Sequence, residues 1–255
     1  MRCKDCGFIF TNPRPANTLI ANDAGVSNLI EDYANKSNNP RKQAAYRKRI
    51  KQFESYRKFN RMLEVGSNVG GFIYQAKQSG WDVTGVEPVS NCAAYGREHF
   101  GLNILPTTLE EASLPDDHFD VVYSNAVIEH IANPSLVLQH ITRVLRPGGI
   151  VYIDTVNYDS ITRKRIGAGW KLLDPGPHVS LYTPRTLPQF LSKAGLQIKR
   201  IRTSGVRLRP NKSPRLHGWR RWREELHKMP LSILARVTNQ GDSIEIWGIK
   251  PDKPG

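Results

Sequence analysis

The chain has 255 residues, which is enough for one α/β domain of roughly 150 to 200 residues with additions, but too short for two full enzymatic domains. No apolar run approaches the roughly 20 residues that cross a bilayer, and the N-terminus lacks a signal-peptide pattern, so we expect a soluble, cytoplasmic protein. Three cysteines, Cys3, Cys6 and Cys92, are too few for a disulfide framework.

The formal net charge of +14 is concentrated in two flanks of the chain. Residues 41–61 carry nine basic residues and one acid, and residues 199–255 carry fourteen basic residues and five acids. The centre, residues 62–198, is mildly acidic. Clustered Lys and Arg attract nucleic acid, an anionic membrane surface or a phosphorylated substrate, but they also arise on solvated helix faces. The charge pattern leaves these alternatives open, and the sequence does not indicate an oligomeric state.

For the part of the chain before residue 61, the sequence predicts one helix. Residues 1–20 contain two cysteines and several prolines, which predict a turn followed by a loop. Between residues 40 and 60, large apolar side chains recur at spacings of three and four among basic residues: Tyr46, Ile50, Phe53 and Tyr56. This spacing predicts an amphipathic helix over 40–60. We therefore divide the chain into a Cys-containing segment, 1–39, and a main domain, 40–255.

From residue 61 onward, predicted strands alternate with predicted helices. Apolar and β-branched runs predict strands at 62–65, 82–86, 103–105, 119–124, 150–155, 197–202 and 243–249. Helical spacing predicts helices at 70–80, 89–100, 134–145 and 183–194. The alternation implies right-handed βαβ units and a mainly parallel sheet. Residues 205–240 keep near-helical spacing but contain three prolines, which predicts an irregular helical insertion broken into pieces.

The segment from Met62 to Gly71 predicts a strand that runs through a glycine-containing turn into a helix. Glycine allows a tight turn and a close approach of the backbone to a ligand, and the helix start offers unpaired N–H groups. This arrangement indicates a nucleotide-type cofactor site. By itself it does not distinguish NAD from S-adenosylmethionine, because both use such a turn and an acidic residue about 20 positions later.

Two acidic residues refine this interpretation. Glu87 follows Gly66 by 21 residues at the end of the second predicted strand, where a carboxylate can accept both ribose hydroxyls of either cofactor. Glu64 precedes the first glycine. A carboxylate there is unfavourable beside a pyrophosphate and favourable beside a cationic amino-acid group, unless it only caps nearby backbone N–H groups. Glu64 therefore favours S-adenosylmethionine over a dinucleotide.

Five motifs occur in a characteristic order along the chain. They are Leu63-Glu64-Val65-Gly66 with Gly70; Val86-Glu87-Pro88; Phe119-Asp120-Val121-Val122; Ile128-Glu129-His130-Ile131; and Val144-Leu145-Arg146-Pro147-Gly148-Gly149. This ordered set resembles the motifs of class I S-adenosylmethionine-dependent methyltransferases over roughly residues 60–200. The chain departs from the family pattern at Asn68, where the commonest turn has glycine. Asn tolerates left-handed backbone better than most residues, so we expect the turn to survive with altered geometry.

The resemblance implies a fold and a set of cofactor-binding residues. The implied fold is Rossmann-like, a mainly parallel seven-stranded sheet with helices on both faces and an antiparallel last strand. The implied binding residues are Glu64, Gly66, Ser67, Asn68 and Gly70 for the methionine part of S-adenosylmethionine, Glu87 with Pro88 for the ribose, Thr108 and Leu109 beside the adenine, and Asn125 at the floor of the pocket. Leu109 is equally well explained as a core residue.

Two histidines are candidates for catalysis. The methyl group of a sulfonium is already activated, so the protein mainly aligns the acceptor, and a base is needed only if the acceptor must lose a proton. His130 follows the fourth predicted strand and His178 lies in the loop after the fifth, and each also has a structural interpretation. Asn157 and Tyr158 are further candidates for the acceptor pocket, because open α/β sheets bind ligands at the carboxyl ends of their strands.

Cys3-Lys4-Asp5-Cys6-Gly7 resembles one knuckle of a zinc ribbon, as found before some methyltransferases of this type. A structural zinc site needs four ligands, and a second Cys-x-x-Cys is missing from the sequence. Cys92 is expected in a buried helix. The knuckle is then a remnant, part of a truncated ribbon, or a half-site shared between chains, and we predict no bound metal.

We therefore expect an enzyme that uses S-adenosylmethionine to methylate a small polar acceptor, such as a sugar or a related metabolite. An RNA or protein methyltransferase that uses the basic flanks is an alternative. So is a non-catalytic protein of this fold that docks on a membrane or partner through the Trp-containing segment 219–229. We favour the interpretation of that segment as a lid over the acceptor site. A nicotinamide oxidoreductase is disfavoured by Glu64.

Overall fold

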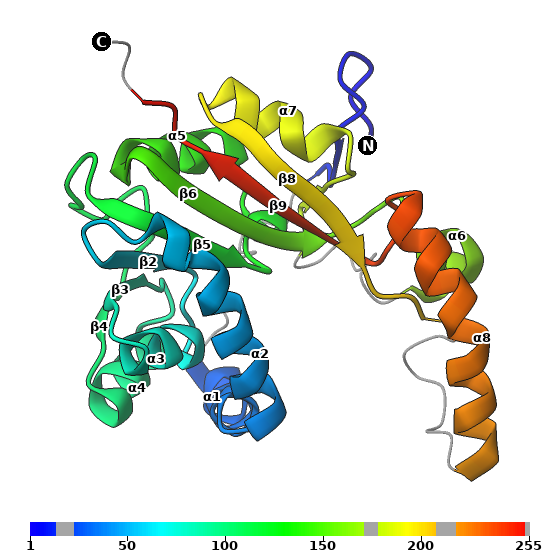
Figure 1. Ribbon diagram of the computed structural model, residues 1–255, viewed down its shortest axis with the longest axis horizontal. Coiled ribbons are helices and arrows are strands. Elements are labelled where there is room, and N and C mark those ends of the chain that lie inside the picture. Colours follow the sequence, from blue (N-terminus) through cyan, green and yellow to red (C-terminus); the bar gives the residue numbers. More distant parts are fainter. Residues whose placement is uncertain (14–22, 171–177, 208–217, 253–255) are drawn as a thin grey trace.

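A seven-stranded sheet organises the computed structural model, which describes residues 1–13, 23–170, 178–207 and 218–252. The strand order is β4-β3-β2-β5-β6-β9-β8, and only β9 runs antiparallel to its neighbours. The strands are β2 (Arg61–Val65), β3 (Asp82–Val86), β4 (Asn103–Leu105), β5 (Phe119–Asn125), β6 (Leu145–Val156), β8 (Gln197–Ser204) and β9 (Ser243–Ile249). Helices cover both faces of the sheet (Figure 1). The predicted Rossmann-like fold with an antiparallel last strand is confirmed.

Alternation along the central strands divides the core into two layers. Leu63 and Val65 point to one face, which is covered by α5 (Pro134–Val144) and α7 (Thr186–Lys193). Met62 and its even-numbered neighbour Glu64 point to the other face. This second face is covered by α2 (Pro40–Ile50), the 3₁₀ turn η1 (Lys51–Tyr56), α3 (Gly71–Gln78) and α4 (Ser90–Phe100). Successive side chains of a strand point to opposite faces, so a carboxylate at position 64 must lie in the layer between β2 and α2–α3.

The predicted strands and helices from residue 61 onward are confirmed within a few residues, except at the start of β6 and in the region 205–240. The sequence predicts a helix through residue 145, a turn, and a strand at 150–155, whereas β6 already begins at Leu145. Leu145 pairs with Phe119, and an irregularity in the pairing follows it. Gly148, with φ of +69°, accommodates this irregularity inside the strand. Gly148 and Gly149, which follow the predicted helix, therefore belong to the bulged start of a long strand.

The N-terminal region contains more structure than the sequence predicts. Helix α1 (Asp23–Ser37) was not expected, and β1 (Ile9–Phe10) pairs antiparallel with β7 (Ser180–Leu181). The predicted helix over 40–60 is confirmed as α2 followed by η1, with the Asn39 side chain accepting the backbone N–H of Arg41 at its start. Two further short elements, α6 (Ile161–Ile166) and the 3₁₀ turn η3 (Gly167–Gly169), follow β6. Helix α1 and the start of α3 are in close contact, since a Cβ on Gly71 would lie 2.2 Å from the Ser37 Oγ.

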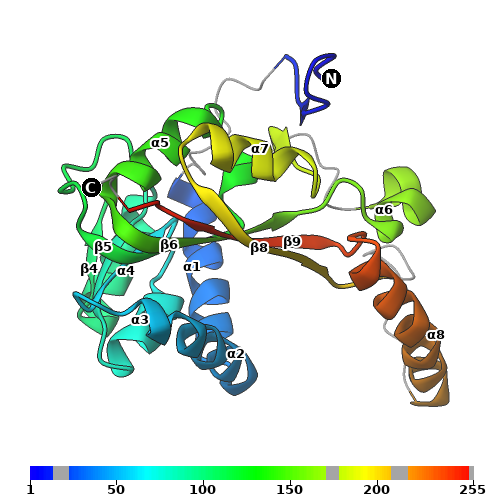
Figure 2. The ribbon, with the colours of Figure 1, turned by 45° about the horizontal axis from the view of Figure 1, so that its top comes forward.

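Helix α8 (Gly218–Val237) differs most from its prediction. Residues 208–217 of the predicted insertion lie outside the described residues, but 218–237 form one helix that continues through Pro230 rather than separate pieces. The helix extends away from the sheet (Figures 1 and 2). It is attached near its C-terminal end, where Ala235 is buried and its carbonyl accepts a hydrogen bond from the Thr203 Oγ1. No described residue of α8 lines the cavities of the candidate site, and the role of this segment as a lid stays a prediction.

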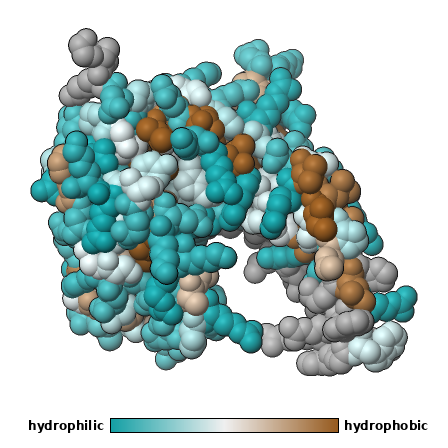
Figure 3. Space-filling model, viewed as in Figure 1, coloured by the Kyte–Doolittle hydropathy of each residue, from teal (hydrophilic) through white to brown (hydrophobic). Residues whose placement is uncertain are grey.

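The exposed surface of α8 carries a stripe of large apolar side chains. They recur at spacings of three, four and seven residues, which places them along one side of the helix. The stripe consists of Trp219, Leu226, Met229, Ile233 and Val237. Its members are highly exposed, with Ile233 at 62% and Val237 at 77% (Figure 3). Across the described part of the chain, no helix combines the length and the apolar character that a membrane-spanning segment needs.

Candidate functional site

The loop between β2 and α3 has the geometry of a ligand-binding turn. Gly66, Asn68 and Gly70 all have positive φ, at 71°, 50° and 82°. The backbone N–H groups of Gly66 and Ser67 donate to the carbonyl of Val86 at 2.9 and 3.1 Å, which fastens the loop to the end of β3. Asn68 adopts a left-handed conformation, and its Oδ1 accepts the N–H of Val69 at 2.7 Å. The expectation that Asn68 preserves the turn is confirmed.

Glu87 holds this loop in place. Its Oε2 accepts the backbone N–H of Asn68 at 2.8 Å, and its Oε1 accepts the backbone N–H of Val89 at 2.9 Å. Burial raises the pKa of Glu87, and these two N–H groups act in the opposite direction. Each carboxylate oxygen can accept a second hydrogen bond. Glu87 can therefore stabilise the loop and bind ribose hydroxyls at the same time, and its role at the ribose stays a prediction.

A cavity of about 180 Å³ lies beside the loop, at the carboxyl end of β2. Five of the predicted cofactor residues line it: Glu64, Gly66, Ser67, Asn68 and Asn125. Gly70 belongs to the same turn without lining the cavity. A Cβ on Gly66 would lie 2.4 Å from the Val127 Cγ2, so the turn leaves no room for a side chain at that position. The cavity is thus built by the residues that the sequence selected for the methionine part of the cofactor.

The sequence missed the part of this cavity that α1 and α2 contribute. Tyr33 and Ser37 of α1 and Lys42 and Tyr46 of α2 lie on the wall of the cavity. The Lys42 Nζ lies 5.4 Å from the centre of the Tyr46 ring, and burial lowers the pKa of Lys42. The basic amphipathic pattern over 40–60 indicated that a basic side chain lies near the site, but it did not identify Lys42 as that side chain.

Glu64 places a buried carboxyl group on the wall of this cavity. It is only 6% exposed, and its carboxylate accepts the backbone N–H of Ile73. Its Oε2 has no hydrogen-bond partner among the described residues. Burial raises the pKa of Glu64 well above its usual value, with a further increase from Glu87, while Lys42 favours the charged form. A buried acceptor without a partner is costly, so the site suits a cationic donor such as the ammonium group of an amino acid.

The other predicted cofactor contacts lie away from the described cavity. Leu109 is buried in the core layer under α5, which supports its interpretation as a core residue. The Thr108 carbonyl accepts the N–H of Ala112, and Pro88 is exposed at the surface beside Glu87. None of the three residues Pro88, Thr108 and Leu109 lines the 180 Å³ cavity. Their placement beside an adenine and ribose stays a prediction.

A second cavity, of about 290 Å³, opens next to the first. The two share Ala126, which follows β5 and has φ of +54°. The second cavity lies at the carboxyl ends of β5, β6 and β8. Four charged side chains contribute to its lining: Glu129, Asp154, Asp242 and Arg207. A cofactor held in the first cavity would therefore have a pocket with several charged groups for an acceptor beside it.

Asp154 lies where the two cavities meet. Its backbone carbonyl accepts the N–H of Ala126 at 2.9 Å, and its carboxylate accepts the Tyr152 hydroxyl at 3.3 Å. Burial, with the nearby carboxylates of Glu245 and Glu129, raises the pKa of Asp154 to about 7. A carboxylate with that pKa is a suitable proton acceptor at neutral pH. The sequence placed this residue within a strand and did not select it.

The structure brings His130 and His178 together. Their ring centres lie 4.9 Å apart, and Glu129 lies beside them. Neither histidine lines the second cavity, whereas Glu129 does. Their predicted roles as bases stay predictions. Glu129 itself was not selected from the sequence, although it stands directly before His130.

Asn157 and Tyr158 do not join the acceptor pocket. The Asn157 Nδ2 donates to the carbonyls of Asn239 and Gly241, at 3.2 and 2.7 Å, and its Oδ1 accepts the N–H of Asp159. These bonds engage the Asn157 side chain in holding the connection before β9. Tyr158 packs against the guanidinium of Arg163. Both residues lie beyond the strand end, as expected, but neither lines the 290 Å³ cavity.

Comparison with known proteins identifies the family. A family model described as "Methyltransferase domain" matches residues 37–201. The chain belongs to this methyltransferase family. Its fold is that of the class I S-adenosylmethionine-dependent methyltransferases, and S-adenosylmethionine is the cofactor of the family. The unpartnered Oε2 of Glu64 and the left-handed turn at Gly66 fit the cationic methionine part of that cofactor.

Two curated relatives and one solved structure illustrate the similarity. The chain is 31% identical over 147 residues to a ubiquinone biosynthesis O-methyltransferase of Cereibacter sphaeroides, covering 53% of this chain and 60% of that protein. It is 27% identical over 130 residues to a malonyl-acyl-carrier-protein O-methyltransferase of Enterobacter lignolyticus, covering 51% of each. A methyltransferase structure from Archaeoglobus fulgidus aligns with a TM-score of 0.59 at 19% identity, covering 82% and 94% of the two chains. The match thus spans half to three fifths of the curated relatives' length.

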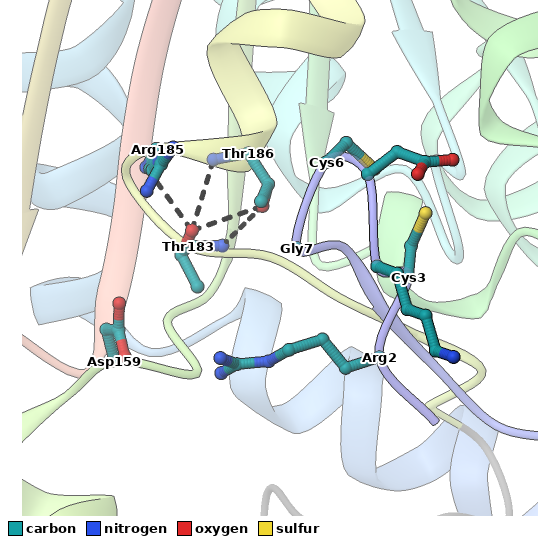
Figure 4. Close-up of a pocket in the computed structure, with 10 residues that line it drawn as sticks. Arg2, Cys3, Cys6, Gly7, Asp159, Thr183, Arg185 and Thr186 are labelled. Atoms are coloured by element: carbon teal, nitrogen blue, oxygen red, sulfur yellow. Dashed lines mark hydrogen bonds between the residues drawn. The ribbon is translucent and has the colours of Figure 1, made fainter.

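The cysteine pair of this methyltransferase-family chain lies at a third cavity, of about 410 Å³, against the start of α7 (Figure 4). The Gly7 N–H donates to the Cys3 carbonyl at 3.1 Å, which closes the turn. Hydrogen bonds from Cys6 and Asp5 lower the pKa of Cys3. The resemblance of this turn to a zinc-ribbon knuckle and the absence of a bound metal both stay predictions.

Replacing Glu64 by Gln tests the electrostatics of the cofactor cavity. Glu64→Gln keeps the shape but loses the charge, so we expect the affinity for S-adenosylhomocysteine to fall about 30-fold, as for the loss of a charged hydrogen bond worth about 2 kcal/mol. Isothermal titration calorimetry measures this affinity. Glu98→Gln, on the exposed side of α4, is the matched control. Unchanged affinity in Glu64→Gln would remove the ammonium assignment.

Glu64→Gln also tests how the free energy of unfolding depends on pH. Because the folded state raises the pKa of Glu64, its contribution to stability is present below the unfolded pKa of about 4.3 and is lost as the pH rises through the folded pKa. The free energy of unfolding of the native chain should therefore fall, relative to Glu64→Gln, between pH 5 and pH 8. Urea denaturation at both pH values measures this difference.

Proposed function

We propose that this chain transfers a methyl group from S-adenosylmethionine to a hydroxyl oxygen of a small polar acceptor, with Asp154 as the proton acceptor. One observation carries the proposal: the cofactor cavity and the carboxylate-lined cavity meet at Ala126, and Asp154 lies at that junction. The two curated relatives are named O-methyltransferases, which agrees with an oxygen acceptor.

The chemistry needs little from the protein beyond alignment and one proton transfer. S-adenosylmethionine, when bound, would supply an electrophilic methyl group for transfer to the acceptor oxygen, with the electron pair of the broken C–S bond left on sulfur. Glu64 would hold the ammonium group and Lys42 the carboxylate of its methionine part, and the loop at Asn68 would hold that part in place. Asp154 takes the hydroxyl proton, which then passes to water. Holding both partners in line supplies most of the rate enhancement.

The charge of the second cavity limits the acceptor. Three acidic residues, Glu129, Asp154 and Asp242, and one basic residue, Arg207, line this space. Burial raises the pKa of Asp242 as well as that of Asp154, so added negative charge is unfavourable there. An anionic acceptor, such as a free carboxylate, is therefore disfavoured. A neutral acceptor with hydroxyl groups, the class that contains sugars and catechols, can donate hydrogen bonds to these carboxylates.

The pH dependence of the reaction tests the role of Asp154. The native chain is incubated with S-adenosylmethionine and three acceptors, catechol, glucose and malonate, and S-adenosylhomocysteine is quantified by mass spectrometry. We expect turnover with a hydroxyl acceptor but not with malonate, and a rate that rises with pH through about 7 as the Asp154 carboxyl ionises beside Glu129, Glu245, Tyr152 and Arg49.

Asp154→Asn should lower this rate about 100-fold and abolish its rise near pH 7. Asp116→Asn removes an exposed carboxylate that pairs with Arg143, and it should leave the rate and its pH dependence unchanged. A variant Asp154→Asn with the native rate would contradict the role of this carboxylate. Turnover of malonate alone would contradict the hydroxyl acceptor.

A second function is favoured by the apolar stripe of α8. We infer that this helix attaches the protein to an anionic membrane surface. The stripe is exposed, the helix extends away from the sheet, and residues 199–255 carry fourteen basic residues against five acids. An amphipathic helix with Trp and basic residues is typical of segments that lie in the membrane interface. The excess of positive charge selects anionic lipid over a neutral surface.

Vesicle flotation tests this attachment. We expect the chain to float with vesicles of phosphatidylcholine and phosphatidylglycerol but not with phosphatidylcholine alone. Ile233→Glu should lower the affinity about tenfold, because it removes one apolar side chain from the interface. Ser232→Glu adds the same charge beside the stripe and should have a smaller effect. Equal binding to both vesicles would overturn the inference. The inference would also be overturned if the chain did not bind vesicles and light scattering detected a dimer that Ile233→Glu dissociates.

A further inference from the structure

Three potential metal ligands converge beside the second cavity. One ligand atom from each of Glu129, His130 and His178 lies within 4.8 Å of the other two. Glu129 and His130 belong to the 3₁₀ turn η2 (Ile128–His130), which follows β5, whereas His178 lies two residues before the start of β7. Glu129 is buried, and the two histidines are partly buried. Chain segments far apart in the sequence therefore supply one carboxylate and two imidazoles to the same place.

The backbone holds these two segments together independently of the three side chains. The N–H of Val179 donates to the carbonyl of Glu129 at 2.9 Å. The Ser180 Oγ donates to the carbonyl of Ile131 at 3.0 Å, and the Thr11 Oγ1 donates to the carbonyl of His178 at 3.2 Å. Ser180 is fully buried. The fold thus fixes the backbone positions of the three ligands. Rotation of their side chains changes the distances between the ligand atoms by a few tenths of an ångström to a few ångströms.

The carboxylate is also oriented by a neighbour. The Thr155 Oγ1, buried at the end of β6, donates to the Glu129 Oε2 at 2.8 Å. Hydrogen bonds of this kind to metal-ligating side chains fix their orientation and raise metal affinity. Thr155 and Glu129 both line the second cavity. The carboxylate therefore belongs to the histidine cluster and to the wall of the acceptor pocket.

We propose that Glu129, His130 and His178 bind a divalent transition-metal ion of the zinc type. Two imidazoles and one carboxylate form a ligand set that such ions prefer, and three protein ligands leave further coordination positions open. With ligand distances of about 2.1 Å, the three atoms must lie within about 4.2 Å of one another, so binding requires only a small closure of the cluster. The two histidines, predicted as separate bases, then act as a pair of ligands.

The position of the ion gives it a role if the proposed function holds. Because Glu129 faces the second cavity, an ion on this carboxylate lies at the rim of the acceptor pocket. An acceptor hydroxyl that occupies an open coordination position loses its proton more easily, and Asp154 receives it. The metal site would explain why a pocket with several carboxylates accepts an oxygen nucleophile. Binding of the ion itself does not depend on this role.

Zinc titration of the full chain tests the site directly. The experiment uses a Cys3→Ser, Cys6→Ser double variant, so that the thiols of the knuckle do not bind the probe. Calorimetry with Zn²⁺ should show one ion per chain. His130→Ala and His178→Ala should each weaken binding about 100-fold, and Thr155→Val should weaken it about tenfold, because it removes the hydrogen bond that orients Glu129.

Control measurements separate this site from structural damage and from the proposed function. His99→Ala removes an exposed histidine of α4 that stacks on Tyr95, and it should leave zinc binding unchanged. Affinity for S-adenosylhomocysteine, measured without metal, should be unchanged in every variant. Visible absorption of the Co²⁺-loaded double variant, which keeps all three ligands, should show a nitrogen- and oxygen-ligated ion. Absence of Zn²⁺ and Co²⁺ binding, or undiminished zinc affinity in His130→Ala, would overturn the proposal.

Discussion

The buried carboxylate of Glu64 is the constraint around which the cofactor cavity is organised. A charge in the layer between a parallel sheet and its helices loses its hydration, and such a loss costs several kcal/mol unless another group compensates. Within the described residues, one backbone N–H and the distant Lys42 are the groups that favour the charged form. The Oε2 atom has no hydrogen-bond partner there. The fold therefore keeps an unfavourable group in its centre, and a cationic ligand would relieve it.

The neighbouring turn complements this charge. Left-handed residues at Gly66, Asn68 and Gly70 turn the chain sharply from β2 into α3, and Glu87 fastens the turn from the adjacent strand. One short segment therefore provides a carboxylate for a cation and a backbone that a ligand can approach closely. Because parallel strands end at the same edge of the sheet, the second cavity forms next to the first, with Ala126 between them. One edge of the sheet thus provides a site for each of two reactants.

The sequence predicted the parts of this site that are local in the chain. Glu64, Gly66, Ser67 and Asn68 lie in one strand-turn segment, and the conformation of that segment follows from strand periodicity and turn chemistry. The mainly parallel seven-stranded sheet with an antiparallel last strand also followed from the alternation of elements and the family motifs. The bulged start of β6 was missed because Leu145 pairs with Phe119, and such pairing is a tertiary interaction that overrides the local signal of Pro147-Gly148-Gly149.

Residues that join the site through packing could not be predicted. Lys42 and Tyr33 reach the cofactor cavity because α1 and α2 pack across α3, and no periodic pattern specifies that packing. Asp154 was recognisable as a strand residue, but its raised pKa depends first on burial and then on Glu245 from β9 and Glu129 from η2. Pro230 predicted a break, whereas α8 continues through it. The two histidines were selected separately, and only the fold brings their rings within 4.9 Å.

Calorimetry with two competing ligand classes tests the central claim, that the segment from Glu64 to Gly70 binds a sulfonium amino-acid cofactor rather than a dinucleotide. S-adenosylhomocysteine and NAD are titrated separately into the native chain under identical conditions. The account predicts saturable binding of S-adenosylhomocysteine at one site per chain, with affinity lost in Glu87→Ala, and no binding of NAD. Binding of NAD alone would contradict it.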